Sequence, residues 1–305
     1  MKATRILSRV AALLLCLTLF LSGCSSQPQN EAEKELTIYA SFYPVYALAA
    51  AIVSDIPGMR LHQLVQPQDG CLRNYTLSDW DLYTASNADA LILAGSGLES
   101  FADTVSSLGE NGPAVARVLG SLVLRTEEWG SEHFSGVNPW LFLSVEGARQ
   151  ISEAIAANML ELDPACENLY LANLHAADER LSALKTEMAD ILAGANLTAP
   201  VAVLHEGLFY LADEWSLNVV TAIERESGDT LSEEALETLS QSGARVVLIE
   251  KQAPEALVKR LEADGYRAAL IDTFSTGNET MGADGYYAAM KNNARALKTA
   301  LADAD

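Results

Sequence analysis

The stretch PACENLYLANLHAADERLSALKTEMADILAG, residues 164–194, decides the architecture of this chain. Its apolar side chains recur at alternating intervals of three and four residues, which places them along one face of an α-helix. This stripe comprises Leu174, Ala177, Leu181, Leu184, Met188 and Ile191. About 30 helical residues extend roughly 45 Å, which is longer than a small domain is wide. We therefore expect the helix to run from one lobe of the protein to another.

Capping residues mark the ends of this helix and of the one before it. Asp163 and Pro164 supply an N-cap and a first-turn proline for the long helix, and Gly194 is its natural stop. Ser144 is placed to cap the preceding helix. The apolar stripe of that preceding helix comprises Ala148, Ile151, Ile155, Met159 and Leu162.

Short β-rich runs alternate with helical patterns on both sides of these helices, which is typical of parallel sheets. The expected strands are 36–40, 61–66, 90–94, 122–125, 201–204, 217–222, 244–250 and 267–271. The expected helices outside the linking region are 45–53, 78–86, 206–213, 232–240, 254–263 and 285–301. The fold class is therefore α/β, with two lobes that each hold a mostly parallel sheet flanked by helices and that are joined by one long linking helix.

This organisation gives five expected segments along the chain. They are a lipoprotein signal peptide (1–23), a flexible tether (24–35), an N-terminal α/β lobe (36–143), the linking helices (144–195) and a C-terminal α/β lobe (196–305).

The first residues have the pattern of a bacterial lipoprotein signal. A basic start is followed by an apolar run, residues 10–21, that is too short to span a bilayer as a mature helix. Leu21-Ser22-Gly23-Cys24 then resembles a lipobox, whose cysteine thiol takes the lipid. The alternative is an ordinary cleaved signal with a chance cysteine. We expect an extracytoplasmic protein, anchored to the cell membrane by a lipid on Cys24.

Charge and cysteine content narrow the function classes. The formal charge is −21, and removal of residues 1–23, which contain three basic residues and no acidic one, makes it −24. So acidic a surface repels nucleic acid. Beyond the signal and Cys24 only Cys71 and Cys166 remain. They are far apart in sequence, so whether they form a disulfide stays open.

Two residues stand where an open α/β sheet binds its ligands, beyond the carboxyl ends of strands. His205 follows one expected strand and Asp272 follows another. An imidazole and a carboxylate together suit zinc or manganese. The alternative on position alone is a structural pair that caps a helix or satisfies a hydrogen bond.

Four segments resemble the solute-binding lipoproteins of zinc and manganese ABC importers. They are Ser41-Phe42-Tyr43-Pro44-Val45-Tyr46, Gly95-Ser96-Gly97-Leu98-Glu99, His205-Glu206-Gly207-Leu208-Phe209-Tyr210-Leu211-Ala212 and Tyr287 to Leu301. The match runs in order from about Leu36 to Leu301, and the long central helix is that family's hallmark. The resemblance implies zinc or manganese as a transported ligand, no catalytic cofactor, an ABC permease as partner and a monomeric chain.

The resemblance also implies four metal ligands, and only two of them are present here. His205 and Asp272 fall on the C-lobe ligand positions, whereas the two N-lobe histidine positions hold Arg73 and Trp140. An arginine brings a fixed positive charge and no lone pair, and an indole nitrogen only donates hydrogen bonds. The expected site is therefore degenerate.

Three readings of the altered positions stay open. Cys71 or His133 could substitute for the lost ligands and rebuild a zinc site with His205 and Asp272. Alternatively the cleft is repurposed, with Arg73 bonded to Asp272 or to an anionic or chelated ligand and Trp140 as a stacking surface. In the third reading Arg73 and Trp140 simply plug a dead site.

Enzyme motifs are lacking in the sequence. Gly95-Ser96-Gly97 follows a strand, but a dinucleotide fingerprint needs a third glycine where Ser100 stands. No nucleophile elbow or phosphate-binding Gly-Lys-Ser/Thr loop occurs. We expect a binding protein and not an enzyme: a receptor for a metal ion, a receptor for another small ligand, or a non-binding protein that interacts with a permease or another envelope partner.

The lipoprotein reading is tested by replacing Cys24. Cells that express the chain and are fed a clickable fatty acid should label it, and Cys24→Ala should abolish the label and release or mislocalise the protein, because the lipid is its expected anchor. Membrane fractionation and in-gel fluorescence measure both effects. A Cys24→Ala protein that keeps its label and its membrane association contradicts the reading.

Overall fold

A computed structural model of the chain describes residues 35–67, 72–108, 112–128, 135–223 and 230–302. Its first sheet is built from β1 (Leu36–Ala40), β2 (Met59–Gln63), β3 (Ala90–Leu93) and β4 (Ala114–Arg117) in the order β2-β1-β3-β4. Its second sheet has β7 (Pro200–Val203), β8 (Asn218–Ala222), β9 (Val246–Glu250) and β10 (Arg267–Ile271) in the order β10-β9-β7-β8. All neighbouring strands within these two sheets are parallel. The predicted α/β class with two lobes is confirmed.

The helices connect and cover these sheets. The first lobe carries α2 (Tyr43–Val53), α3 (Asp79–Ser86) and α4 (Ala102–Ser106), and the second carries α7 (Leu208–Glu214), α8 (Glu233–Gln241) and α9 (Glu255–Ala263). In the sequence, α5 (Val145–Leu162) and α6 (Glu167–Leu192) come between the two lobes, and α10 (Gly282–Ala302) ends the described chain. The strands β5 (Thr126–Glu128) and β6 (Ser135–Val137) pair as a two-stranded antiparallel sheet. Short 3-10 turns are Leu72–Asn74, Leu141–Leu143, Pro164–Cys166 and Glu279–Met281.

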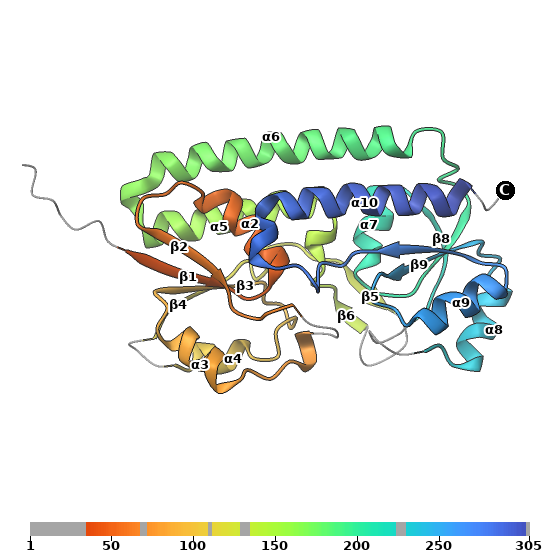
Figure 1. The fold of residues 1–305 in the computed structure, drawn as a ribbon, viewed down its shortest axis with the longest axis horizontal. Coiled ribbons are helices and arrows are strands. Elements are labelled where there is room, and N and C mark those ends of the chain that lie inside the picture. Colours follow the sequence, from red (N-terminus) through yellow and green to blue (C-terminus); the bar gives the residue numbers. More distant parts are fainter. Residues whose placement is uncertain (1–34, 68–71, 109–111, 129–134, 224–229, 303–305) are drawn as a thin grey trace, which may run out of the picture. The chain divides into compact units, whose positions relative to one another are not determined.

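The long helix α6 is continuous and passes both sheets, as the sequence predicted (Figure 1). Its predicted stripe faces the core: Ala177, Leu181, Leu184 and Met188 are buried. The helix packs on α5, α10 and α2. Because one rigid helix contacts elements of both halves of the chain, it fixes how the two sheets stand to each other. Within the described residues, no helix has the length and apolar character that a bilayer crossing requires.

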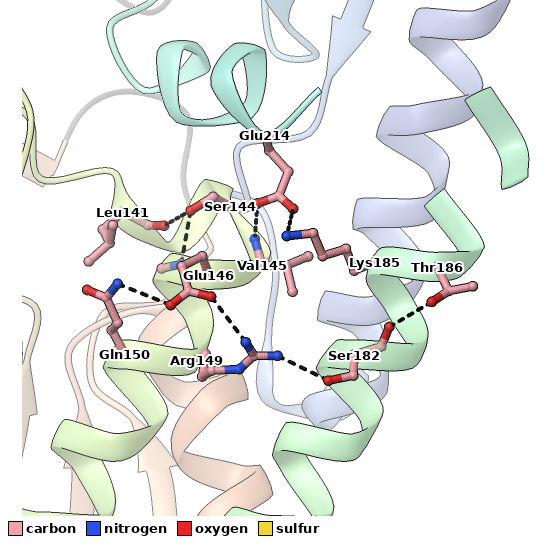
Figure 2. A network of polar contacts seen from close by, with 11 residues as sticks. Leu141, Ser144, Val145, Glu146, Arg149, Gln150, Ser182, Lys185, Thr186 and Glu214 are labelled. Atoms are coloured by element: carbon pink, nitrogen blue, oxygen red, sulfur yellow. Dashed lines mark hydrogen bonds and ion pairs between the residues drawn. The ribbon is translucent and has the colours of Figure 1, made fainter. Parts of the chain in front are cut away.

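Glu214 ties the second lobe to the linking helices (Figure 2). It is the last residue of α7, and its Oε2 accepts a hydrogen bond from the backbone N–H of Val145, the first residue of α5, at 3.1 Å. Its Oε1 lies 3.6 Å from the Nζ of Lys185 on α6. A carboxylate at a helix N-terminus is favoured by the helix dipole. One side chain of α7 therefore contacts two further helices, α5 and α6.

Some predicted boundaries are wrong. Residues 122–125 form no strand: Leu122 and Leu124 pack on the core from irregular chain, and the fourth strand is Ala114–Arg117. That strand is a sheet edge whose side chains are exposed or only half-buried, so its apolar signal is weak. Asp163 also does not cap the long helix through its side chain, because its Oδ2 accepts from the hydroxyl of Tyr170 instead.

Other predictions from the sequence are confirmed or concern residues outside the described ones. Ser144 caps α5, since its Oγ accepts from the backbone N–H of Gly147. The helix predicted over 206–213 is α7, which begins two residues later, at Leu208. The signal peptide and Cys24 lie outside the described residues.

We expect Tyr286 to make the stability of the fold sensitive to alkali. Its hydroxyl is fully buried on α10 and donates to the carbonyl oxygen of Phe142 at 2.8 Å, and burial raises the pKa of Tyr286 well above its ordinary value. A folded pKa above the unfolded value of about 10 stabilises the fold below that pH, and the contribution is lost as pH rises further. Tyr286→Phe should cost about 1 kcal/mol at pH 7 but should lessen the decline in stability above pH 10.

Urea denaturation at pH 7 and between pH 9 and 11 measures both effects. The exposed Tyr83→Phe is the matched control and should leave the pH profile unchanged. Parallel profiles for Tyr286→Phe and the unmodified chain contradict the assignment.

Candidate functional site

The C-lobe side of the site is a three-residue turn between β7 and α7. It consists of His205, Glu206 and Gly207, all of which are buried. The backbone N–H of Gly207 donates to Nδ1 of His205 at 3.1 Å. A neutral imidazole that accepts at Nδ1 carries its proton on Nε2. In this arrangement neither ring nitrogen of His205 presents an open lone pair to a metal ion.

Trp140 fits into this turn and contacts all three of its residues. Its ring centroid lies 4.6 Å from that of His205 in an edge-to-face arrangement, and its indole Nε1–H donates to Oε1 of Glu206 at 2.9 Å. A Cβ at Gly207 would come within 2.7 Å of the Cγ of Trp140, so only glycine allows this approach. The turn is thus shaped to receive the indole.

Asn138 holds the segment that carries Trp140. Its Oδ1 accepts from the backbone N–H of Trp140 at 3.1 Å, and its Nδ2 donates to the carbonyl oxygen of Glu206 at 2.8 Å. The hydroxyl of Tyr210 on α7 donates to the carbonyl oxygen of Asn138 at 2.9 Å. These hydrogen bonds of Asn138 hold the segment of Trp140 against the C lobe, in addition to the contacts of the indole ring itself.

Arg73 reaches the same carboxylate from the N lobe. Its guanidinium nitrogen lies 2.9 Å from Oε1 of Glu206, and its side chain is 27% exposed, against 4% for that of Glu206. Arg73 sits in the 3-10 turn Leu72–Asn74, directly before α3. The partner of Arg73 is therefore Glu206, and the interpretation that Arg73 bonds to Asp272 is wrong.

Asp272 is occupied by its own turn. Its Oδ1 accepts from the backbone N–H of Phe274 at 2.8 Å, and its Oδ2 lies 3.5 Å from the Nζ of Lys251. Asn293 on α10 bonds to both the N–H and the carbonyl oxygen of Asp272. These contacts fit the structural alternative, and a role of Asp272 as a metal ligand stays a prediction.

The space between the lobes at this point is small. A cavity of about 20 Å³ remains, which is room for roughly one water molecule. Its walls come from both lobes and comprise Phe42, Gln63, Val65, Gln66, Leu72, Trp140, Thr273 and Ser275. In this conformation the cleft has no space for a chelated or other small ligand.

Among the described residues, no cluster of three or more histidine, cysteine, aspartate or glutamate side chains could hold a metal ion. The proposed substitutes Cys71 and His133 lie outside the described residues, so their part in a rebuilt site stays a prediction, as does the pairing of Cys71 with Cys166.

Sequence reasoning missed Glu206 as the partner of Arg73 and missed the role of Gly207. A signal was present, since an arginine between two lobes in place of a histidine favours a carboxylate nearby. Glu206 follows directly on a candidate ligand, His205. No local pattern distinguishes Glu206 from Asp272 as this carboxylate.

The fold and this arrangement define a class of protein, the two-lobed receptors whose site lies between parallel sheets joined by a long helix. The family model described as ZnuA, zinc-uptake complex component A periplasmic, matches residues 38–300. Because this range covers most of the chain, the chain belongs to that family, and the predicted resemblance is confirmed.

Curated relatives support the assignment. The chain is 26% identical over 312 residues to the manganese ABC transporter substrate-binding lipoprotein PsaA of Streptococcus pneumoniae, with 96% of each chain covered. It is 24% identical over 303 residues to the zinc-binding lipoprotein AdcA of Streptococcus pneumoniae strain TIGR4, covering 93% of this chain. The chain spans 59% of the length of AdcA.

Solved structures share the fold. The substrate-binding protein FpvC of Pseudomonas aeruginosa in complex with Mn²⁺ superposes with a TM-score of 0.78 at 24% identity, covering 89% of this chain and all of that one. A ZnuA crystal structure superposes with a TM-score of 0.72 at 22% identity, covering 88% and 100% of the two chains.

We expect Gly207→Ala to destabilise the chain by about 1–3 kcal/mol, because the new methyl group would overlap the indole of Trp140. Gly207 has ordinary helical backbone angles, so the cost would arise from this contact and not from backbone strain. Urea denaturation measures it. In a Trp140→Gly background, which removes the contacts with Cγ and Cβ of Trp140 and leaves only that with Cδ1 of Leu143 at 2.9 Å, its cost should be clearly smaller. Equal costs in both backgrounds contradict the contact.

Proposed function

We propose that this chain is the extracytoplasmic substrate-binding lipoprotein of a metal-ion ABC importer, with two of its four expected metal ligands replaced. Family membership supports the general role, and relatives are named as zinc-binding and manganese-transport lipoproteins. One observation supports the altered site. The residues at the two N-lobe ligand positions, Arg73 and Trp140, both bond to Oε1 of Glu206.

The chemistry of these groups makes free zinc or manganese a weak cargo. Arg73 and Trp140 bring N–H donors where a metal ion requires lone pairs. His205 and Asp272 already accept hydrogen bonds from backbone N–H groups. Two carboxylate or imidazole donors offset too little of the desolvation of a divalent ion, since a closed zinc site uses four.

The remaining parts of the proposal follow from the same family. They are an ABC permease as partner, a lipid anchor on Cys24, a monomeric chain, no catalytic activity, and segment boundaries at residues 23, 35, 143 and 195. The second parallel sheet and α10 lie within the proposed C lobe, and α5 and α6 within the proposed linking region.

A second candidate is supported by the cavity of about 20 Å³. A cleft filled by Trp140 and an ion pair suits a protein that keeps the fold for interaction with a permease or another envelope partner and binds no cargo. A receptor for a chelated ligand would need the cleft to open. Neighbouring permease and ATPase genes would support either kind of receptor.

Calorimetric titration of zinc and manganese decides between these functions. We expect the purified mature chain to bind either ion roughly 100-fold or more weakly than the variant Arg73→His with Trp140→His, because a lost ligand costs more than the 10–100-fold of a lost outer partner. The double variant should also show a metal-dependent rise in melting temperature. Adding His205→Ala to it should abolish tight binding.

The unmodified chain supplies the contrary outcome. Tight stoichiometric binding that His205→Ala abolishes but Cys71→Ser and His133→Ala leave intact would show that the ligands are misplaced. Tight binding lost with Cys71→Ser or His133→Ala would instead favour the rebuilt site. No binding by a folded double-histidine variant would favour a cleft made for another ligand, or for none.

A further inference from the structure

The Arg73–Glu206 ion pair joins two segments that are far apart in sequence. Arg73 belongs to the 3-10 turn that follows the first-lobe strand β2, whereas Glu206 follows the second-lobe strand β7. Their side chains meet at 2.9 Å, and Trp140 donates to the same oxygen from the segment before the linking helices. A positive group of the chain itself therefore spans the space between the lobes.

The burial of Glu206 makes this contact energetically important. Its side chain is only 4% exposed, and a buried carboxylate without a cation is strongly destabilising. Trp140 donates a neutral hydrogen bond to this carboxylate, and the guanidinium of Arg73 brings positive charge to the same oxygen. Arginine suits the position because its charge is permanent and its donors have a fixed planar geometry.

We propose that Arg73 is a tethered cation that holds the two lobes together in place of a cargo ion. The inference rests on the proposed function, in which Arg73 and Trp140 occupy the two N-lobe ligand positions. A divalent ion between the lobes brings positive charge to donors of both halves, and the guanidinium does the same for Glu206 without leaving the chain. The closed arrangement is then independent of metal.

Other contacts between the two halves, some of them charged, can be separated from this ion pair: Arg125 pairs with Asp213, and the backbone N–H of Gln63 donates to the carboxylate of Glu279. Nδ2 of Asn138 donates to the carbonyl oxygen of Glu206, and Nε2 of Gln63 donates to the carbonyl oxygen of Gly277 at 3.3 Å. Trp140 fills the adjoining volume. If these contacts alone closed the cleft, removal of the guanidinium would leave it closed.

A consequence concerns any metal that does reach the site. An ion that uses Glu206 as a ligand must displace Arg73, whose charge repels it. The same residue thus excludes free cations and presents the closed form to a partner at all times. Closure and cargo binding, which a four-ligand site couples, are separated in this chain.

Hydrogen exchange followed by mass spectrometry tests the proposal on the mature chain in EDTA. In the unmodified protein, exchange of residues 72–75 and 205–210 should be the same in EDTA and in zinc. Arg73→Ala should accelerate both segments roughly tenfold or more, since local opening no longer breaks the ion pair. Arg260→Ala, which removes an exposed arginine–aspartate pair within α9, is the matched control and should leave both segments unchanged.

A second variant keeps the test valid if Arg73→Ala does not fold. Arg73→Gln with Glu206→Gln removes both charges, leaves no buried unpaired charge, and keeps an acceptor for Trp140. It should fold, and both segments should still exchange roughly tenfold faster, because neutral hydrogen bonds contribute less than charge-assisted ones.

Two results overturn the proposal. One is wild-type exchange in the neutral double variant, which would show that packing closes the cleft. The other is an unmodified chain whose two segments loosen in EDTA and tighten in zinc. Because the variants are compared in EDTA, their outcome is separate from the calorimetric result. Weak zinc binding with unchanged exchange in the variants rejects the tethered cation alone, and tight zinc binding by the unmodified chain rejects the proposed function.

Discussion

The charge of Glu206, buried almost completely between the lobes, is the constraint on which the site depends. A carboxylate removed from water must be paired and hydrogen-bonded. Arg73 supplies the cation and Trp140 a second donor to the same oxygen. The residues at two expected metal-ligand positions thus both bond to this carboxylate, and their contacts to one atom connect two segments of the N lobe with the C lobe.

The sheets and the long helix α6 determine where the residues around Glu206 lie. Parallel strands deliver the turn of His205, Glu206 and Gly207 at the carboxyl end of the second sheet, where open α/β folds place their ligands. The continuous helix α6 and the contacts of Glu214 with α5 and α6 fix the C lobe to the rest (Figure 2). Gly207 then lets the indole of Trp140 approach the turn closely. The continuous helix α6 and the absence of a side chain at Gly207 together bring Trp140 and Glu206 into contact.

Much of the fold could be predicted because its signals are local. The strand Arg267–Ile271 agrees with its predicted bounds, and the stripe of α6 follows from helical periodicity. Strand β4 was missed because an exposed edge strand has little hydrophobic pattern, whereas the apolar loop around Leu122 and Leu124 imitates a strand. A loop that packs on the core is apolar without being a strand, so hydrophobicity alone does not indicate its secondary structure.

The sequence by itself determined the two-lobed class, the long linking helix, and the loss of two donors at Arg73 and Trp140, because residue type and spacing suffice for each. Only the tertiary structure decided what these two residues do. Glu206 and Asp272 are both carboxylates with which Arg73 could form an ion pair. The fold determines which of the two lies within reach of its guanidinium. Asp272 is held by the N–H of Phe274 and by Lys251, while Glu206 faces the cleft. Pairing across more than a hundred residues of chain is set by the packing of the lobes, and no local pattern records it.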